Sequence, residues 1–396
     1  MIENKKLLIV GGSYLQLPAI IKAKEMGMKV AVADYNQNAI GVSYADKYYN
    51  VSTIDENGIY EAAKDFCADG VITLATDMPM RAVAYACEKL GLNSISYDTA
   101  IKSTNKGEMI KAFEAHGVTH PWYYILQEVE QLDSIESKLT YPCISKPIDS
   151  SGSRGVVLIK SPQELRKSIS YSLKHSPKTG VIIEEYMNGK EVSVEIVVVN
   201  EIVHILAVTD KLTTGAPHFV ETRHTQPSRL GKENIENIKD LAVKAVLAVG
   251  INNGPAHVEI MFTNEGPKLI ELGARMGGDF ISTHLVPLST GVDMMKAVIT
   301  LACGEEVDLK TKFKKGSAIQ YITGDVGFIK KIDGLGLASQ IVGVNEIKML
   351  KNIGDQSRGV FNSHDRLGYV IAQGSTVYTA MNTCEKALSA ISIEIE

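Results

Sequence analysis

Two glutamates, Glu259 and Glu271, lie on a segment that the sequence predicts to be a β-hairpin. Strand-like runs at 256–262 and 267–272 flank a turn signal at 264–266. Counting back from the turn places the glutamates opposite each other, and directly opposed side chains on adjacent strands lie about 4.5–5.5 Å apart. Such like charges are destabilising unless a cation lies between them, and carboxylates with substrate phosphates are the usual ligands of Mg²⁺. The pair predicts a magnesium site; the alternative is a solvated sheet face.

The stretch Gly-Ala-Arg-Met-Gly-Gly at 273–278 follows the second predicted strand directly. Arg275 supplies a cation beside the two acids, and Gly277 and Gly278 supply a flexible exit from the strand. This stretch favours a functional site over a solvated surface.

A lysine lies in the first turn of a predicted helix, which is an unusual place for a cation. The sequence predicts a helix from a Ser103-Thr104 cap to about His116, ended by Gly117. Lys106 falls in its first turn, where the helix dipole disfavours a cation. That placement indicates a nearby anion; the alternative is an exposed, solvated lysine.

A small flexible loop at 149–155 follows Lys146, which ends a buried-type strand. The loop holds Gly152, Gly155, three serines and an arginine, enough backbone and hydroxyl donors to bind phosphate oxygens. It is not a Walker A loop, because no Gly-Lys-Ser/Thr closes it and a strand at 156–159 follows. Lys146 favours a phosphate site over a plain hairpin tip.

Two acids, Glu184 and Glu185, end the apolar strand that starts at Val181, and Met187 follows them. Backbone donors, an apolar side chain and nearby carboxylates such as Glu191 could receive a purine and its ribose hydroxyls. The alternative is that these acids keep an edge strand soluble.

The polar segment at 209–224 is long for a connection, and loops of this kind are often functional. We expect Lys211–His224 to border the pocket of an amine substrate. Glu221 could bind an ammonium group, and His224 could take its proton, because imidazole exchanges protons near neutral pH. An amphipathic helix with Ile238 and Leu241 on its apolar face follows and ends at Gly250.

The N-terminal segment reads as the start of a doubly wound α/β domain. A strand at 6–10, a Gly-Gly-Ser-Tyr turn at 11–14, a helix to about Met26 and a strand at 29–33 follow in order. The turn lacks the third glycine of the dinucleotide fingerprint, so a dehydrogenase is disfavoured. The turn could still bind a substrate anion at the helix N-terminus, but a plain connecting turn is the favoured alternative. A last strand at 94–97 is predicted to close this domain.

Composition excludes several classes of protein. The 396 residues carry a net charge of −5, which gives no support for nucleic acid or an anionic membrane as a partner. We expect no signal peptide and no membrane span. The five scattered cysteines have no CxxC spacing and are typical of a reduced, cytoplasmic protein.

Taken in order, these signals resemble the ATP-grasp superfamily along essentially the whole chain. The layout is similar to that of bacterial L-amino acid ligases, glycinamide ribonucleotide synthetases and biotin carboxylase. The resemblance implies an α/β fold of the α+β ATP-grasp type with three domains. These are an N-terminal doubly wound parallel-sheet domain at 1–98, an ATP-grasp domain at 99–310 with a lid at about 119–187, and a small β-rich C-terminal domain at 311–396.

The resemblance also implies a role for each candidate residue. The ATP-binding set is Lys106, Lys146, Ser151, Gly152, Ser153, Gly155, Glu184, Glu185, Tyr186, Met187 and Glu191. Glu259 and Glu271 are the metal ligands, and Arg275, Lys211, Glu221 and His224 form the catalytic set. Gly11, Gly12, Tyr14, Gly277 and Gly278 are placed on the substrate side.

The implied reaction is ATP-dependent joining of a small carboxylate, such as an amino acid, to an amine through an acyl phosphate. ATP and one or two Mg²⁺ ions are the expected cofactors, and Mn²⁺ can substitute. A homodimer is left open. A purine-pathway ligase, a biotin-carboxylase-like enzyme and a non-catalytic ATP-binding protein are the alternatives. Gly273 departs from the family pattern, because many members carry Asn at this position and complete the metal site with it.

Overall fold

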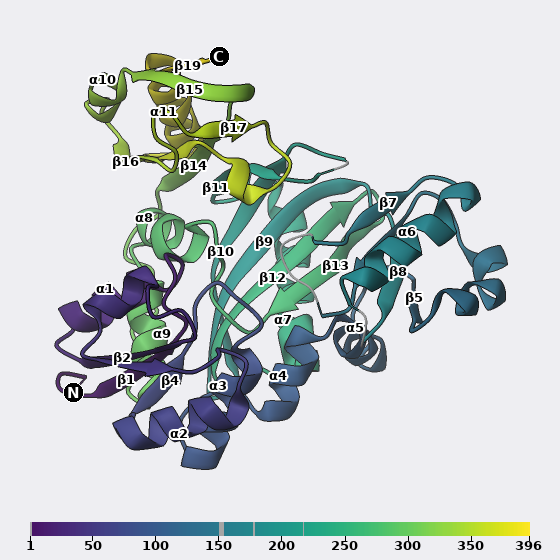
Figure 1. Cartoon of the computed structure of the whole chain (residues 1–396), viewed down its shortest axis with the longest axis horizontal. Helices are drawn as coiled ribbons and strands as arrows, with labels where there is room; N and C mark the ends of the chain where they lie inside the picture. The colour runs from purple at the N-terminus through teal and green to yellow at the C-terminus, as the bar shows by residue number, and fades with distance from the viewer. Residues whose placement is uncertain (1, 150–153, 177–178, 217) are drawn as a thin grey trace.

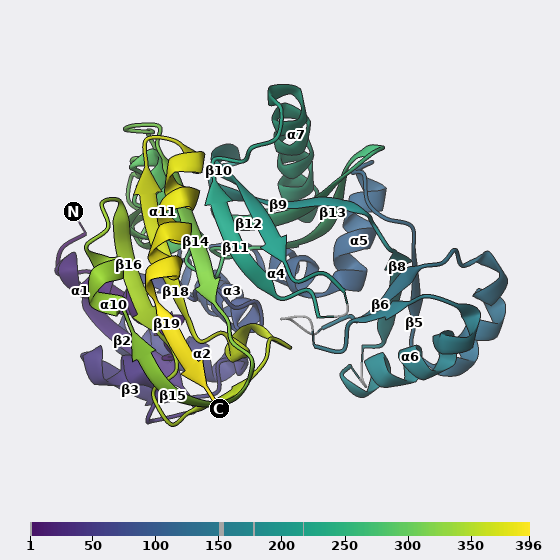
Figure 2. The same cartoon turned by 90° about the horizontal axis from the view of Figure 1, so that it is seen from above.

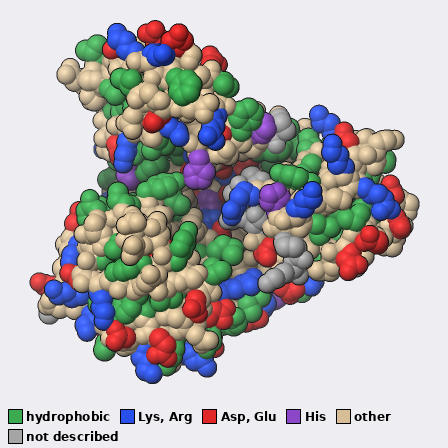
Figure 3. Space-filling model, in the orientation of Figure 1, with side chains coloured by type: hydrophobic (Ala, Val, Ile, Leu, Met, Phe, Trp, Pro, Cys, Tyr) green, Lys and Arg blue, Asp and Glu red, His purple; other side chains and the backbone are tan. Residues whose placement is uncertain are grey.

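The computed structural model describes residues 2–149, 154–176, 179–216 and 218–396. Four groups of elements surround a central hollow (Figures 1 and 3). The four groups are the N-terminal domain, a separate four-stranded sheet, the eight-stranded central sheet and the C-terminal domain. The predicted fold class is confirmed.

The N-terminal domain is a parallel sheet of order β3-β2-β1-β4 with helices packed on it. Its elements are β1 (Lys6–Val10), α1 (Leu17–Glu25), β2 (Lys29–Asp34), η1 (Ile40–Tyr44), β3 (Lys47–Asn50), α2 (Glu56–Phe66), β4 (Gly70–Ile72) and α3 (Met80–Leu90). Buried strands flanked by short loops are what the sequence predicted, because strands covered on both faces read as continuous apolar runs. Strand β1 is buried from Leu7 onward.

Two predictions at the end of this domain are wrong. The segment at 94–97 is not a strand, because the Ser96 side chain accepts a hydrogen bond from the backbone of Thr99 and caps α4 (Tyr97–Thr104). The cap of the next helix is Asn105 rather than Ser103-Thr104, which end α4. Helix α5 spans Lys106–Ala115, so Lys106 is its first residue, as expected.

A four-stranded sheet of order β5-β8-β6-β7 stands apart from the rest of the molecule, at the right of Figure 1. Its elements are β5 (Tyr123–Leu126), η2 (Val129–Ser134), η3 (Glu136–Lys138), β6 (Cys143–Pro147), β7 (Val157–Ile159), α6 (Pro162–Lys174) and β8 (Val181–Glu185). A small core of its own, which includes Leu132, Ile159 and Leu165, holds this unit together. We call it the lid sheet.

The central sheet has eight strands in the order β13-β12-β9-β10-β11-β14-β18-β16. Its first five strands are β9 (Gly189–Val199), β10 (Ile202–Thr213), β11 (Glu221–Gln226), β12 (Gly254–Thr263) and β13 (Gly266–Gly273), and α7 (Lys232–Val249) packs on them. The predicted loop at 209–224 is therefore wrong. Lys211 lies in β10 and pairs with His224 in β11, so both ends of this polar stretch belong to strands of the central sheet.

Three C-terminal strands, β14, β18 and β16, continue the central sheet, because β11 pairs with β14. The other three form a separate sheet of order β17-β15-β19. The remaining elements are η4 (Ile281–Leu285), α8 (Val286–Thr290), α9 (Met294–Ala302), β14 (Gly316–Ile322), β15 (Val326–Asp333), α10 (Leu335–Ser339), β16 (Val344–Met349), β17 (Gln356–Arg358), η5 (Ser363–Asp365), β18 (Gly368–Gly374), α11 (Val377–Ala390) and β19 (Ser392–Ile395). Figure 2 shows α11 lying along this part of the sheet.

Within the described ranges, no single helix is long and apolar enough to cross a membrane. One bent pair, Ile281–Thr290 with Met294–Ala302, meets the length and composition test but is broken by an angle of 116°.

Candidate active site

A cavity of about 820 Å³ opens between the lid sheet and the central sheet. It corresponds to the hollow in Figure 3, where side chains of both charge signs are exposed. The described predicted residues that line it are Lys106, Lys146, Glu185, Tyr186, Met187, Glu191, Lys211, Glu221, Glu259 and Glu271. Five separate segments of the sequence, which include most of the described residues of the predicted nucleotide site, thus meet at one cavity.

The two hairpin glutamates face each other as the turn predicted. Glu259 in β12 pairs directly with Glu271 in β13, and a bulge follows Glu259. Each carboxylate already has a cation beside it: Nζ of Lys211 lies 2.8 Å from Oε1 of Glu259, and Nζ of Lys106 lies 3.1 Å from Oε2 of Glu271. The repulsion between the two carboxylates, from which a cation was predicted here, is therefore relieved by Lys211 and Lys106 in this structure.

The pair fits Mg²⁺ bound together with phosphates. No group of three or more His, Cys, Asp or Glu side chains that could hold a metal ion occurs among the described residues. Mg²⁺ commonly uses one or two carboxylates and completes its shell with water and substrate phosphates. Glu259 and Glu271, both lining the cavity, provide that donor set when a nucleotide supplies the remaining oxygens.

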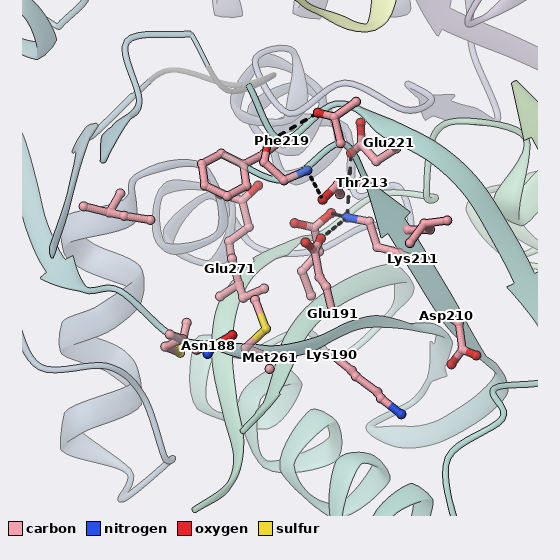
Figure 4. Close-up of a pocket in the computed structure, with 18 of the residues that line it drawn as sticks. Asn188, Lys190, Glu191, Asp210, Lys211, Thr213, Phe219, Glu221, Met261 and Glu271 are labelled. Atoms are coloured by element: carbon pink, nitrogen blue, oxygen red, sulfur yellow. Dashed lines mark hydrogen bonds and ion pairs between the residues drawn. The ribbon is translucent and has the colours of Figure 1, made fainter. Parts of the chain in front are cut away.

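Lys211 is the centre of an ion-pair network (Figure 4). Its Nζ lies 2.5 Å from Glu191, 2.8 Å from Glu259 and 3.8 Å from Glu221, and only 3% of its side chain is exposed. Burial opposes the charged form, but the three carboxylates outweigh it and raise the pKa of Lys211 well above its ordinary value. Lys211 therefore remains charged. It forms ion pairs with the predicted ribose ligand Glu191, the predicted metal ligand Glu259 and the predicted amine ligand Glu221.

The predicted nucleotide residues divide into two groups. Nζ of Lys146 lies 2.6 Å from Glu184, and the two form a buried pair on β6 and β8, the two inner strands of the lid sheet. Burial disfavours the ammonium, but Glu184 dominates and raises the pKa of Lys146. Glu184 does not line the cavity, whereas Glu185, Tyr186 and Met187 do.

The phosphate loop is only partly described. Ser151, Gly152 and Ser153 lie outside the described residues. Gly155 is described but does not line the cavity, although its neighbours Arg154 and Val156 do.

Arg275 does not line the large cavity but borders a small one that it shares with Lys106 and Glu271. Its guanidinium makes a two-pronged pair with Asp77 of the N-terminal domain, with Nε 2.9 Å from Oδ1 and Nη2 3.3 Å from Oδ2. Burial opposes the charge, but Asp77 raises the pKa of Arg275. This side chain is therefore fixed at the domain boundary, next to the predicted metal ligand.

His224 is fully buried and does not line the cavity. Its Nε2 lies 3.4 Å from Oδ2 of Asp279, and the same carboxylate oxygen is 2.8 Å from Nη2 of Arg366. Nη2 of Arg366 also lies 3.1 Å from Oε2 of Glu221. A C-terminal arginine thus holds the predicted ammonium ligand in place, whereas the position of His224 does not favour direct proton transfer from a substrate in the cavity.

The five glycine and tyrosine positions predicted on the substrate side do not line the large cavity. The backbone N–H of Gly12 donates to Asp34 at 2.7 Å, which closes the first turn of the N-terminal domain. Tyr14 is 57% exposed. Partial desolvation raises the pKa of its hydroxyl, and the nearby charge of Asp279 adds to that rise. Tyr14 thus lies near Asp279, whereas Gly11 and Gly12 belong to the turn that connects β1 to α1.

Sequence reasoning missed Asp77, Glu195, His257, Asp279 and Arg366. Glu195 and His257 did leave a signal, because each interrupts a run of apolar strand residues. A charged side chain in a strand that is otherwise buried requires a partner. Asp77, Asp279 and Arg366 lie in loops, where an acid or an arginine carries no such signal.

Comparison with known proteins agrees with this arrangement. Residues 139–284 match the ATP-grasp domain family, and residues 320–396 match the L-amino acid ligase C-terminal domain 2 family. The chain therefore carries an ATP-grasp domain and, after it, a domain like the C-terminal one of L-amino acid ligases.

The similar proteins include amino acid ligases and a purine-pathway enzyme. Alanine–anticapsin ligase of Bacillus subtilis strain 168 is 28% identical over 275 residues, which cover 63% of this chain and 57% of that protein. The structure of an L-amino acid ligase from Bacillus licheniformis superposes with a TM-score of 0.85 at 24% identity, covering 100% of this chain and 99% of that one. A phosphoribosylglycinamide synthetase structure from Anaerococcus prevotii gives 0.81 at 23%, with both chains covered fully. The fold of this chain is thus common to both of these enzymes.

Proposed function

We propose that this ATP-grasp ligase joins an amino acid, or a similar small acid, to an amine and converts ATP to ADP and phosphate. One observation carries the proposal: Glu221 lines the same cavity as the candidate nucleotide and metal residues. A carboxylate there suits an ammonium group of an amino acid substrate. The match of residues 320–396 to the C-terminal domain of L-amino acid ligases supports the same branch.

In the proposed reaction, the substrate carboxylate attacks the γ-phosphorus of ATP, and the bond to ADP breaks. The amine nitrogen then attacks the acyl carbon, and the carbon–oxygen bond to phosphate breaks. Phosphoryl transfer depends mainly on positioning and on neutralising negative charge. Lys106 and Lys146 line the cavity and would bind the phosphate oxygens, while Glu185, Tyr186, Met187 and Glu191 would bind the nucleoside.

Glu259 and Glu271 would hold Mg²⁺, which supplies charge neutralisation for the phosphate oxygens when bound. Arg275, held by Asp77, would steady the transferred phosphoryl group from the domain boundary. Glu221 would bind the ammonium form of the amine and accept its proton before attack. His224 is too deeply buried for that step and would act only through Asp279.

The test is a screen for ADP release with each amino acid, alone and in pairs, in the presence of Mg²⁺. We expect release that requires a particular amino acid or amino acid pair. Release only with nucleotide-sugar amines such as phosphoribosylamine would contradict the amino acid assignment and support the purine branch. The variant Glu271→Gln controls for contaminating ATPases.

We also propose the domain division 1–98, 99–310 and 311–396, small molecules as the only substrates, and a cytoplasmic location. All five cysteines are free and four are buried, which suits a reducing compartment. A homodimer remains a proposal, and the molar mass from light scattering tests it. Cell fractionation tests the location.

A further inference from the structure

A buried hydrogen-bonded chain lies directly beneath Glu259. Nε2 of His257 is 3.2 Å from Oε1 of Glu259, and Nδ1 is 2.9 Å from Oε1 of Glu195. His257 in β12 and Glu195 in β9 are registered neighbours. Glu195 has no solvent exposure and His257 has 4%, so both are in the protein interior.

The imidazole of His257 therefore bridges two carboxylates. An ionised carboxylate only accepts hydrogen bonds, so both ring nitrogens must carry a proton for both contacts to form. The ring is then an imidazolium ion between two anions.

The contacts of Glu259 fall on one of its two oxygens. Lys211 and His257 both approach Oε1, at 2.8 Å and 3.2 Å. Across the described parts of the chain, Oε2 of Glu259 has no recorded hydrogen bond or ion pair. One oxygen is thus held, and the other is available on a side chain that lines the cavity.

The far end of the chain is fixed as well. The hydroxyls of Ser193 and Ser282 donate to Glu195 at 2.9 Å and 3.0 Å. A Cβ at Gly277 would lie 2.7 Å from both Oε2 of Glu195 and Nδ1 of His257. Gly277 is therefore packed against the hydrogen-bonded series Glu195–His257–Glu259, which we call the relay. Any larger residue at 277 would displace the Glu195 and His257 side chains.

We propose that His257 is a positioning residue for the metal, with Glu195 as its fixed counter-ion. The relay holds Oε1 of Glu259 so that Oε2 is presented to Mg²⁺. This inference rests on the proposed function, in which Glu259 is a metal ligand. Hydrogen-bond partners of metal ligands typically contribute about 10–100-fold to metal affinity or activity.

The test measures Mn²⁺ binding in the presence of ADP, with free Mn²⁺ quantified by electron paramagnetic resonance. We expect His257→Gln and Glu195→Gln each to weaken Mn²⁺ binding about 10–100-fold. In His257→Gln, the amide oxygen must face one of two carboxylates, because a glutamine amide has only one donor end. ADP binding without metal should remain unchanged in both variants.

The double variant Glu195→Gln with His257→Gln separates hydrogen-bond donation from charge. In this variant, the amide at position 195 can donate a hydrogen bond to the amide oxygen at position 257. The amide nitrogen at position 257 can then donate to Glu259. We expect this pair to regain most of the Mn²⁺ affinity lost in the single variants. His204→Gln, on the adjacent strand β10, is the matched control and should bind Mn²⁺ as the wild type does.

Wild-type or tighter Mn²⁺ binding in both single variants would overturn the proposal, since a positioning role requires that each variant lose Mn²⁺ affinity. A double variant no better than the single ones would also overturn it. If His257→Gln fails to fold, Ser282→Ala removes one donor to Glu195, and normal Mn²⁺ binding in that variant would count against the relay. Glu259→Gln distinguishes the two levels: normal Mn²⁺ binding there overturns the metal assignment itself, and with it the inference.

Discussion

Arg275 and Asp77 join the ATP-grasp part of the chain to the N-terminal domain through a two-pronged ion pair of 2.9 and 3.3 Å. The pair depends on Gly273, the last residue of hairpin strand β13. A Cβ at Gly273 would lie 2.6 Å from Oδ1 of Asp77 and 3.0 Å from Nε of Arg275. Gly273 thus leaves space for a carboxylate from another domain.

Gly273→Ala should therefore lower kcat at least about tenfold, because a displacement of about 1 Å near the reacting groups can reduce catalysis by far more. The melting temperature should change little, since the residue ends strand β13. Amino acid-dependent ADP release measures kcat. Gly336→Ala, which has no atom within 4 Å of the added carbon, is the control, and equal kcat in both variants would refute the steric argument.

Glu271→Gln tests the metal site. The amide keeps the volume of the side chain and loses its charge, so Mg²⁺-dependent turnover should fall at least about 100-fold while the fold is retained. Turnover across a Mg²⁺ titration and circular dichroism provide the two measurements. Glu265→Gln in the exposed turn of the same hairpin should behave as wild type. Normal turnover of Glu271→Gln would remove this residue from the site.

Much of the site could be predicted from the sequence because its signals are local. The hairpin register follows from turn chemistry and strand alternation, so the opposition of Glu259 and Glu271 was found by counting. Lys106 and Lys146 were marked by their places at element ends. These positions depend on residues within a few places along the chain.

The parts that escaped prediction depend on contacts between distant segments. Asp77 is 198 residues from Arg275, and Arg366 is 145 residues from Glu221. The polar stretch at 209–224 was mistaken for a loop because its charged side chains find buried partners across the sheet instead of solvent. Local polarity cannot distinguish these two cases, since burial of a charge is decided by its partner.

Lys211→Met should make the stability of the protein depend on Mg²⁺. Removing the buried cation leaves Glu191, Glu259 and Glu221 facing one another, and loss of one partner of a buried ion pair typically costs about 3–5 kcal/mol. A divalent cation bound at Glu259 would relieve part of that repulsion and raise the melting temperature by mass action.

Differential scanning fluorimetry with and without Mg²⁺ checks this expectation. The rise on adding Mg²⁺ should be larger for Lys211→Met than for the wild type. Lys239→Met, on the exposed face of α7, is the control for loss of a lysine. An equal Mg²⁺ response in all three proteins would show that Lys211 does not occupy the place of a cation.

Asp279→Asn should remove stability in a pH-dependent way. Burial disfavours the carboxylate, but the hydrogen bond from His224 and the charge of Arg366 outweigh it and lower the pKa of Asp279. A lowered pKa contributes stability that is present above the ordinary value of about 3.9 and is lost as the pH falls through the folded-state pKa. The melting-temperature difference between wild type and variant should therefore be constant from pH 5 to 8 and shrink below about pH 4. A difference that grows towards low pH would contradict the assignment.

Glu221→Ala decides whether the amine site lies where we propose. The change removes the carboxylate that would bind the substrate's ammonium group, and an interaction of a charged group is typically about 1.5–3 kcal/mol. The KM for an amino acid should rise about tenfold or more, whereas the KM for ATP should stay within about twofold because the phosphate and nucleoside residues are untouched. Arg366 keeps its 2.8 Å contact with Asp279, so the surrounding cluster should persist. Initial rates with each substrate varied in turn give both constants, and Glu236→Ala on the solvent face of α7 is the control. A parallel rise in both KM values would place Glu221 in nucleotide binding through Lys211, and the amine site would then have to lie elsewhere.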